Sequence, residues 1–293
     1  MLWLSWLVSA AACAHGGAGT AGDGAQPTDA PPGHDGAGGH DAPVSADAPQ
    51  SHDAPAPKPM TLLLSEVMLG PTGGEFIEIV NPTSAAVDLS TYYLADRNDY
   101  YKLPGGALTA VANDFIVKFP ASSSLAAGGV VTVAVGTATA FHNTTSVNPT
   151  YSITDGTMAL AGATSLIGSQ PGLTDAGELI VLFQWNGTSD LVKDVDLFIA
   201  GSPSVANGLA SKSQVAQGAS TYLVDVDTLP TQSAPAPGTS TKRILLETGH
   251  ENQNGNGNGI TGDDETSENT ALTWDQGSYT GPTPGAVPSQ LLL

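Results

Sequence analysis

Residues 62–96 read LLLSEVMLGPTGGEFIEIVNPTSAAVDLSTYYLAD and carry the clearest structural signal in the chain. They contain two strand-like runs, Leu62–Met68 and Glu75–Val80, joined by the turn sequence GPTGG at residues 70–74. Gly and Pro mark turns because they supply the backbone angles that a tight reversal needs. A second turn, NPTS at residues 81–84, leads into a third apolar segment. This succession predicts a β-hairpin followed by a further strand.

Short runs of the same kind continue along the chain. They lie at Tyr92–Ala95, Asp114–Phe119, Val130–Val135, Glu178–Trp185, Leu191–Ile199 and Arg243–Glu247. Several alternate polar and apolar residues, as DVDL does at residues 194–197, and this period of two predicts half-buried strands. The sequence WNGT at residues 185–188 links two runs, and Asn-Gly is typical of a two-residue hairpin turn. Short strands separated by turn residues predict an all-β sandwich or barrel.

Composition limits the partners that the protein can bind. The chain has 293 residues, with 28 Asp and Glu against 8 Lys and Arg, so its formal net charge is −20. Such a surface repels phosphate backbones, and we expect no nucleic-acid partner. Gly and Pro are abundant, at 35 and 21 residues, which suits short strands, many turns and unstructured linkers better than long helices.

The chain begins with MLWLSWLVSAAA, which is followed by Cys13, the only cysteine. Twelve apolar residues are too few to span a bilayer but fit the apolar region of an export signal. The small residues before Cys13 resemble the lipobox of bacterial lipoproteins, in which the cysteine is acylated and becomes the mature N-terminus. We therefore expect residues 1–13 to be a lipoprotein-type signal peptide and Cys13 to anchor the protein at the cell envelope. The outer membrane or cell surface is the favoured location, and the alternative is a signal peptide cut elsewhere.

Residues 14–60 are a low-complexity tract of Gly, Ala, Pro, Asp and His. Asp-Ala-Pro recurs at residues 29, 41, 47 and 53, and large apolar side chains are almost absent. Such a tract buries too little surface to offset the entropy lost on ordering, so we predict a disordered linker. Weak metal binding by its His-Asp pairs is an alternative, because both residue types ligate Zn²⁺.

The hairpin of residues 62–96 resembles the opening of the lamin tail domain, an immunoglobulin-like β-sandwich of nuclear lamins and of many secreted or surface bacterial proteins. Two further segments resemble the same family, PASSSLAAGGVVTVAV at residues 120–135 and LTDAGELIVLFQWNGTSDLVKDVDLFI at residues 173–199. Lys242-Arg243, Trp274 and Thr283-Pro284-Gly285 resemble its closing segment. The resemblance implies an immunoglobulin-like antiparallel β-sandwich over residues 61–288. Residues 137–171, 202–239 and 249–269 are longer than the family's loops and form insertions.

One insertion contains a candidate calcium loop. Asn254, Asn256 and Asn258 alternate with glycines, and Glu265 lies eleven residues after Asn254. Calcium loops use oxygen-bearing side chains at alternate positions and a bidentate Glu at position twelve. The spacing therefore indicates a weak calcium site, and the alternative is a polar loop with no metal. We expect no other cofactor.

Catalytic signals are weak. The sequence contains no Gly-x-Ser-x-Gly, no His-x-x-x-His and no phosphate-binding Gly-Lys-Ser/Thr motif. Glu75 and Glu78 are three residues apart on one predicted strand and face opposite sides of the sheet, whereas Glu66 on the neighbouring strand can approach one of them. A metal-assisted hydrolase would need Glu66, Asp96, His142 and Asp263 to converge.

The function that these observations favour is non-enzymatic. A linker displays one lamin-tail-like sandwich at the cell surface, where it binds an unknown protein or an envelope polysaccharide as a monomer. The alternatives are a calcium-stabilised adhesion or matrix module and a metal-assisted hydrolase with its site in the insertions.

Overall fold

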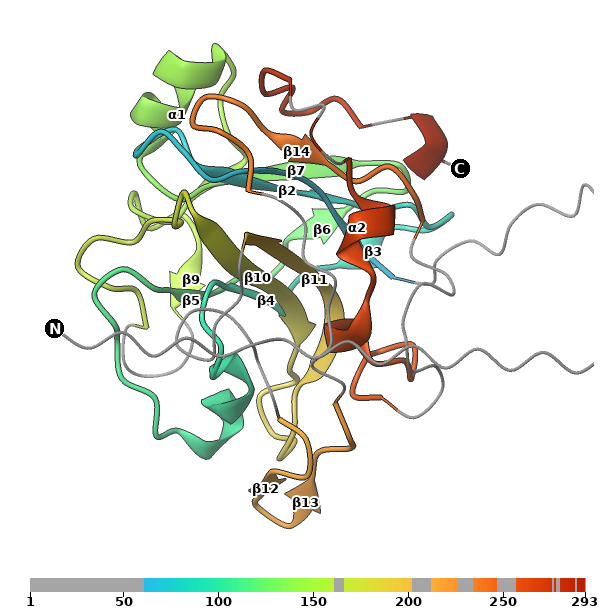
Figure 1. The fold of residues 1–293 in the computed structure, drawn as a ribbon. Coiled ribbons are helices and arrows are strands. Elements are labelled where there is room, and N and C mark those ends of the chain that lie inside the picture. Colours follow the sequence, from blue (N-terminus) through green and yellow to red (C-terminus); the bar gives the residue numbers. More distant parts are fainter. Residues whose placement is uncertain are drawn as a thin grey trace, which may run out of the picture. The chain divides into compact units, whose positions relative to one another are not determined.

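Two five-stranded sheets form the centre of the protein in the computed structural model (Figure 1). The structure describes residues 61–160, 166–201, 212–225, 234–246, 257–275, 277, 280–287 and 289–292, all within one compact unit. The predicted signal peptide, Cys13 and the linker lie outside these residues. No helix in the described ranges is long and apolar enough to cross a membrane.

The first sheet is built on the predicted opening hairpin. Its strands lie in the order β14 (Thr241–Lys242), β1 (Leu63–Met68), β2 (Phe76–Val80), β7 (Val130–Ala134) and β8 (Tyr151–Ser152). All neighbours are antiparallel except β7 and β8, which are parallel. The strand predicted at Arg243–Glu247 is wrong in its position, because β14 precedes it and Arg243 forms only an isolated bridge, with Trp274.

The second sheet contains the longest strands. Its order is β11 (Lys193–Gly201), β10 (Gly177–Gln184), β4 (Tyr92–Ala95), β5 (Ile116–Lys118) and β9 (Ala159–Leu160), and every pairing is antiparallel. The chain between β10 and β11 occupies residues 185–192, so the two-residue turn predicted at Asn186-Gly187 is wrong. Asn186 Oδ1 instead accepts hydrogen bonds from the backbone N–H groups of Thr188 and Ser189 and builds a longer loop.

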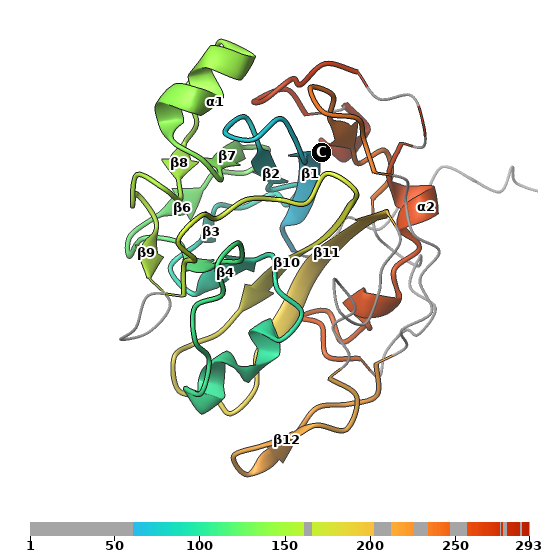
Figure 2. The ribbon, with the colours of Figure 1, turned by 60° about the vertical axis from the view of Figure 1, so that its left-hand side comes forward.

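Smaller elements decorate the two sheets. Two short antiparallel pairs are formed by β3 (Val87–Asp88) with β6 (Ser124–Leu125), and by β12 (Ala216–Gln217) with β13 (Ser220–Thr221). Helices are short: α1 (Ala138–Thr145), α2 (Thr270–Thr273) and the 3₁₀ turns η1 (Tyr100–Gly105), η2 (Glu265–Ser267) and η3 (Ser289–Leu291). The α1 helix and the β12–β13 pair lie at opposite ends of the domain (Figures 1 and 2).

Alternating apolar side chains from both sheets fill the space between them. Ile77 and Ile79 of β2 meet Ile180 and Leu182 of β10 within one buried cluster, which Trp274 completes. In β1 the spacing of the inward residues changes after Leu64 because the register shifts there by a β-bulge. The prediction of an all-β, predominantly antiparallel sandwich is confirmed.

The outer face of the second sheet is also buried. Tyr93, Phe183 and Leu197 point away from the sandwich core and pack against η1 and Tyr222. Half-buried strands were predicted from the alternating pattern, and this prediction is wrong for β10 and β11, since all but their ends are buried. Tyr222 and Leu166, which also join this cluster, come from two of the predicted insertions, so these residues of the insertions pack on the sheet.

Candidate functional site

A groove of about 720 Å³ opens beside the β12–β13 pair. Three chain segments form its walls: the β10–β11 loop with the adjoining ends of both strands, β13 with Leu223, and the loop at residues 257–262. Most lining side chains are neutral and polar or small; they include Trp185, Asn186, Ser189, Ser220, Thr221 and Asn258. Only Asp190 and Lys193 among the lining residues are charged. We call this feature the loop groove.

The β10–β11 loop holds the aromatic wall of the loop groove. The Trp185 indole N–H donates a hydrogen bond of 2.9 Å to the carbonyl of Ser189, and its ring lies 6.1 Å from the ring of Tyr93. Both contacts fix the orientation of the indole while leaving the residue only partly buried. Gly187 has φ = 84°, a left-handed conformation that favours Gly, and this allows the loop to turn.

Asp190 attaches the β12–β13 pair to this loop. Its Oδ2 accepts hydrogen bonds from the Ala219 N–H at 2.8 Å and from the Ser220 hydroxyl at 3.2 Å. Gly218 has a positive φ, and a Cβ atom there would overlap the Asp190 carboxylate. The Asp190 carboxylate therefore connects two walls of the loop groove, the β10–β11 loop and the β12–β13 pair.

The third wall depends on Asn258. Its Oδ1 accepts from the Leu223 N–H at 2.8 Å, and its Nδ2 donates to the Leu223 carbonyl and to Asp225 Oδ1. The loop closes on itself through hydrogen bonds from Gly257 N–H to the Gly262 carbonyl and from Gly259 N–H to the Asp263 carbonyl. Asn258 thus serves both as a lining residue and as a connection to the interior.

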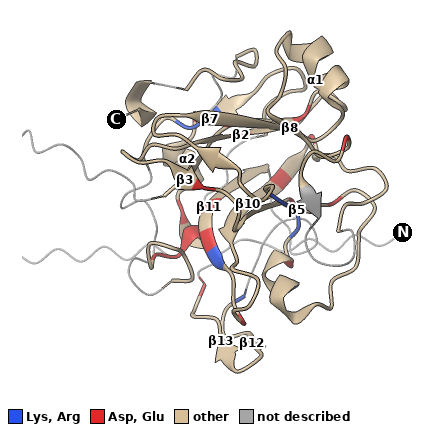
Figure 3. Ribbon diagram, turned by 180° about the vertical axis from the view of Figure 1, so that it is seen from behind, with Lys and Arg blue, Asp and Glu red and all other residues tan. Residues whose placement is uncertain are grey.

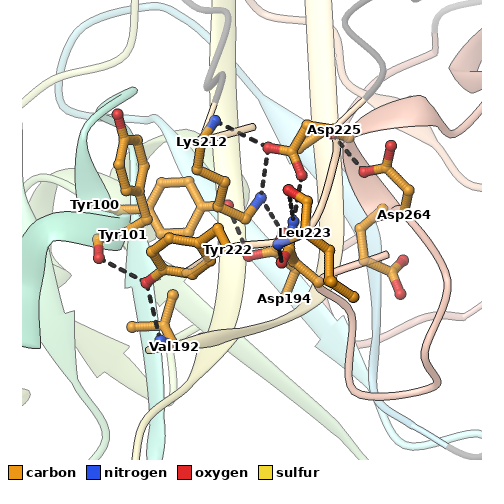
Figure 4. A network of polar contacts seen from close by, with 12 residues as sticks. Tyr100, Tyr101, Val192, Asp194, Lys212, Tyr222, Leu223, Asp225 and Asp264 are labelled. Atoms are coloured by element: carbon orange, nitrogen blue, oxygen red, sulfur yellow. Dashed lines mark hydrogen bonds and ion pairs between the residues drawn. The ribbon is translucent and has the colours of Figure 1, made fainter. Parts of the chain in front are cut away.

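A buried lysine lies directly behind this wall. Lys212 Nζ is 2.6 Å from Asp194 Oδ2 and 3.1 Å from Asp225 Oδ2, and all three side chains are fully buried (Figure 4). Tyr100 donates its hydroxyl to Asp194 Oδ1 at 2.6 Å, and the backbone N–H of Lys212 donates to Asp225 Oδ2. We call Lys212, Asp194 and Asp225 the lysine triad.

Burial and charge act against each other in the lysine triad. Burial lowers the pKa of Lys212, but the attraction of the Asp194 and Asp225 carboxylates outweighs it and raises the pKa above its ordinary value. Desolvation raises the pKa of Asp194 despite the neighbouring lysine. Burial and the Asp194 charge also raise the pKa of the Tyr100 hydroxyl, so it remains a hydrogen-bond donor.

A second buried ionic group lies on the opposite side of β11. Arg243 contacts Asp196 Oδ1 at 2.5 Å and Glu268 Oε1 at 2.9 Å, and its Nε donates to the Leu64 carbonyl. Its guanidinium lies 5.1 Å from the centre of the Trp274 ring. We call Arg243, Asp196 and Glu268 the arginine cluster.

A β-bulge explains how Asp194 and Asp196 reach different partners. Residues two apart on a regular strand share a face. In β11, however, Asp196 pairs with Leu182 while Asp194 pairs with the next residue, Phe183, so Val195 is the extra residue of a bulge. Asp194 consequently faces Tyr100, whereas Asp196 faces Arg243 (acidic residues of β11 are red in Figure 3).

The expected approach of Glu66 to Glu78 is confirmed, because the two residues pair across β1 and β2. Glu66 accepts from the Ser240 hydroxyl and the Thr283 N–H, while Glu78 accepts from the Ser65 hydroxyl and the Gly285 N–H. Burial is the main cause that raises the pKa of Glu78 to about 7, and the Glu66 charge adds to it. Both carboxylates are thus covered by the Thr283-Pro284-Gly285 segment, which the sequence analysis assigned to the end of the domain.

The four residues required for a metal-assisted hydrolase do not converge. Glu66 lies on β1, Asp96 accepts from the Phe115 N–H in the other sheet, and His142 is exposed on α1. In the described ranges, no group of three or more His, Cys, Asp or Glu side chains is arranged to hold a metal ion. The hydrolase hypothesis therefore loses the convergence on which it depended.

The candidate calcium residues are described only in part. Asn254 and Asn256 lie outside the described residues, as Cys13 does. Asn258 and Glu265 are both buried, and the Glu265 carboxylate lies against Gly259 and accepts a hydrogen bond from the Thr261 hydroxyl. The Asn258 oxygen already accepts the Leu223 N–H, so it is directed toward the protein interior. Calcium binding by this loop stays a prediction.

Sequence reasoning missed the residues that hold the groove. Lys212 is the single basic residue between Lys193 and Lys242, and it belongs to no recognisable sequence motif. A signal was present in β11, where two acids interrupt a strongly apolar run in a chain with only eight basic residues. Buried acids require partners, so each pointed to a distant Lys or Arg.

The fold agrees with the comparison to protein families. The model of the lamin tail domain matches residues 55–227, which is more than half of the chain. This chain belongs to the lamin tail domain family. The family consists of non-enzymatic immunoglobulin-like domains, and the resemblance expected from the opening hairpin is confirmed.

Other comparisons are more distant. No curated protein matches the sequence significantly. Among solved structures, a DUF4876 family protein from Bacteroides thetaiotaomicron is similar, with a TM-score of 0.41 and 15% sequence identity over 78% of this chain and 74% of that chain.

Proposed function

We propose that this lamin tail domain protein is a non-enzymatic lipoprotein of the cell envelope that binds a neutral polysaccharide in the loop groove. The observation that carries the proposal is the lining itself: a fixed, partly exposed indole beside a set of hydroxyl and amide side chains. An indole offers an apolar face to the C–H groups of a sugar ring, and neutral polar groups match its hydroxyls.

The charge of the protein selects among polysaccharides. With a formal net charge of −20, the chain repels polymers rich in phosphate or carboxylate groups. A neutral glycan meets no such barrier. The groove is also open along one side and preformed by the Asp190 and Asn258 contacts, so a chain-like ligand enters without reordering the walls.

Binding of the purified full chain to labelled neutral polysaccharide from the native envelope tests this proposal. We expect Trp185→Ala to weaken binding at least tenfold, a loss of about 1.4 kcal/mol. The control is Asn143→Ala, an exposed position on α1 at the other end of the domain, which should bind as the wild type does. Circular dichroism checks that both variants remain folded.

Two results would reject the polysaccharide. The first is no retention of the wild-type protein above background, and the second is equal binding by wild type and Trp185→Ala. Retention of the protein only by a proteinaceous envelope fraction would assign the groove to a protein partner instead.

The anchoring half of the proposal rests on Cys13 and the apolar residues before it. A single acyl chain binds membranes reversibly, whereas several chains on one residue give stable attachment. Mass spectrometry of exported protein is expected to find lipid on Cys13, and Cys13→Ser is expected to release the protein from the membrane fraction. An unmodified Cys13 in exported material would refute the anchor without affecting the groove.

A further inference from the structure

We propose that the lysine triad forms a covalent isopeptide bond between Lys212 Nζ and Asp194 Cγ, with Asp225 as the proton relay. Nothing in the groove requires this bond, so the inference is independent of polysaccharide binding. Its basis is the geometry of three fully buried side chains in which an amine touches two carboxyl groups.

Proximity is the first argument. The Nζ atom lies 2.6 Å from one Asp194 oxygen, within contact distance of the carboxyl group that it would attack. Groups held in this way react as if at effective concentrations of roughly 10⁵–10⁸ M. The backbone fixes both partners, since Asp194 lies on β11 and the Lys212 N–H is itself bound to Asp225.

The two carboxyl groups are placed in different roles. Asp194 Oδ1 accepts the Tyr100 hydroxyl at 2.6 Å, which places a donor at the oxygen where negative charge develops during attack. Asp225 instead accepts the backbone N–H of Lys212 and the side-chain amide of Asn258, and its Oδ2 lies 3.1 Å from the Lys212 amine, within reach of an ammonium proton. Asp194 is therefore the electrophile and Asp225 is the base.

Burial also favours the reactive protonation state. With Asp194 protonated, the Lys212 cation and the Asp225 carboxylate balance, and the enclosed site carries no net charge. The raised pKa of Asp194, caused chiefly by desolvation, agrees with this distribution. The Tyr100 ring, 5.7 Å from Nζ, helps to exclude water from the amine.

The reaction is a condensation that needs no co-reactant. Lys212 passes one proton to the Asp225 carboxylate, and the free amine attacks Asp194 Cγ to form a C–N bond. The Asp194 hydroxyl then takes a second proton from Nζ, by way of Asp225, and leaves as water when its C–O bond breaks. The products are a neutral amide, one water and a protonated Asp225, and no atom is oxidised or reduced.

The bond would also relieve an unfavourable arrangement. An ion pair in a dry interior retains a desolvation penalty on each of its two ions. The amide removes one such pair and keeps an N–H that can donate to Asp225. It would join β11 to the segment that carries β12 and β13, and so fix one wall of the loop groove covalently.

Tryptic mapping of the denatured full-length protein tests the proposal. The sequence contains no Lys or Arg between Lys193 and Lys212, nor between Lys212 and Lys242. An unlinked chain gives separate peptides 194–212 and 213–242. The linked chain gives one peptide, 194–242, because acylated Lys212 is not cleaved, and its mass is lower by one water. Fragment ions must place the link between Lys212 and Asp194.

Variants separate the roles. Lys212→Arg keeps the cation but cannot form this amide, so cleavage after position 212 should return. Asp194→Asn should still form the link with loss of ammonia in place of water, and Asp225→Ala should abolish it. Recovery of the unlinked 194–212 peptide from folded wild-type protein would overturn the proposal, as would a link from Lys212 to Asp225.

Discussion

Replacing Arg243 with Met should lower the free energy of unfolding by far more than the loss of one surface charge would. The side chain is fully buried, contacts two carboxylates at 2.5 Å and 2.9 Å and donates to the Leu64 carbonyl. Met fills much of the volume but leaves Asp196 and Glu268 buried without their cation. Removing one member of such a group costs about 3–5 kcal/mol. For a domain of this size the melting midpoint should fall by about 6–20 °C.

The loss should depend on pH in a defined direction. Burial is the main cause that raises the pKa of Asp196 to about 7, while Arg243 acts to lower it. Without Arg243 the carboxyl takes up a proton at still higher pH. Arg243→Met should therefore lose most stability above about pH 7, where folding requires Asp196 either to ionise without its cation or to keep a proton that the unfolded chain has released, and less as the pH falls.

Urea denaturation followed by circular dichroism measures these losses. The control is Lys242→Met, the adjacent cation, which is only partly buried and lies 3.9 Å from Glu66; it should cost about 1 kcal/mol or less. Adding Asp196→Asn and Glu268→Gln to Arg243→Met should recover much of the loss. Equal losses for Arg243→Met and Lys242→Met would refute the reasoning.

Three further predictions concern other buried polar groups. Glu78→Gln should flatten the pH dependence of stability. The pKa of Glu78 is about 7 in the folded protein and 4.5 ordinarily, so the folded state holds a proton that the unfolded state has lost, and this group alone lowers the free energy of unfolding by about 3 kcal/mol as the pH rises between those values. Urea denaturation of both proteins at several pH values measures this, and an equal change of the free energy of unfolding with pH in the two would contradict it. Asn81→Ala should cost about 1–3 kcal/mol, because its buried amide donates to three carbonyls around the second turn, whereas Asn143→Ala on exposed α1 should cost almost nothing in the same denaturation assay. Asn258→Ala should lower the melting midpoint equally in calcium and in chelator, since its oxygen accepts the Leu223 N–H; a larger loss in calcium would assign that oxygen to a metal instead.

Local sequence patterns predicted the parts of the fold in which the contacting residues are close together in the sequence. The opening hairpin follows from its turn residues and alternating apolar side chains, and β1 and β2 pair as expected. Residues 283–285, which the sequence analysis placed in a closing segment, donate backbone hydrogen bonds to Glu66 and Glu78.

The candidate site depended on contacts that a local pattern does not contain. Alternation in β11 predicted a half-buried strand, but segments carrying Lys212 and Arg243 cover both faces. The bulge at Val195 directs the two acids to opposite faces of the sheet, and the residue pattern of β11 does not predict it. The Asn-Gly tract matched the spacing of a calcium loop, yet Asn258 bonds to Leu223, which is 35 residues away.

The pairing of β14 with β1 has a consequence for how this domain can be divided. Family matching ends at residue 227, before β14, Arg243, Glu268 and Gly285. An expression fragment cut there would remove the Arg243 cation from Asp196, the Ser240 and Thr283 donors from Glu66 and the Gly285 donor from Glu78. A gene fusion or a transplant onto another scaffold must therefore carry β14, Arg243, Glu268 and Gly285 together with the matched segment if these buried carboxylates are to keep their partners.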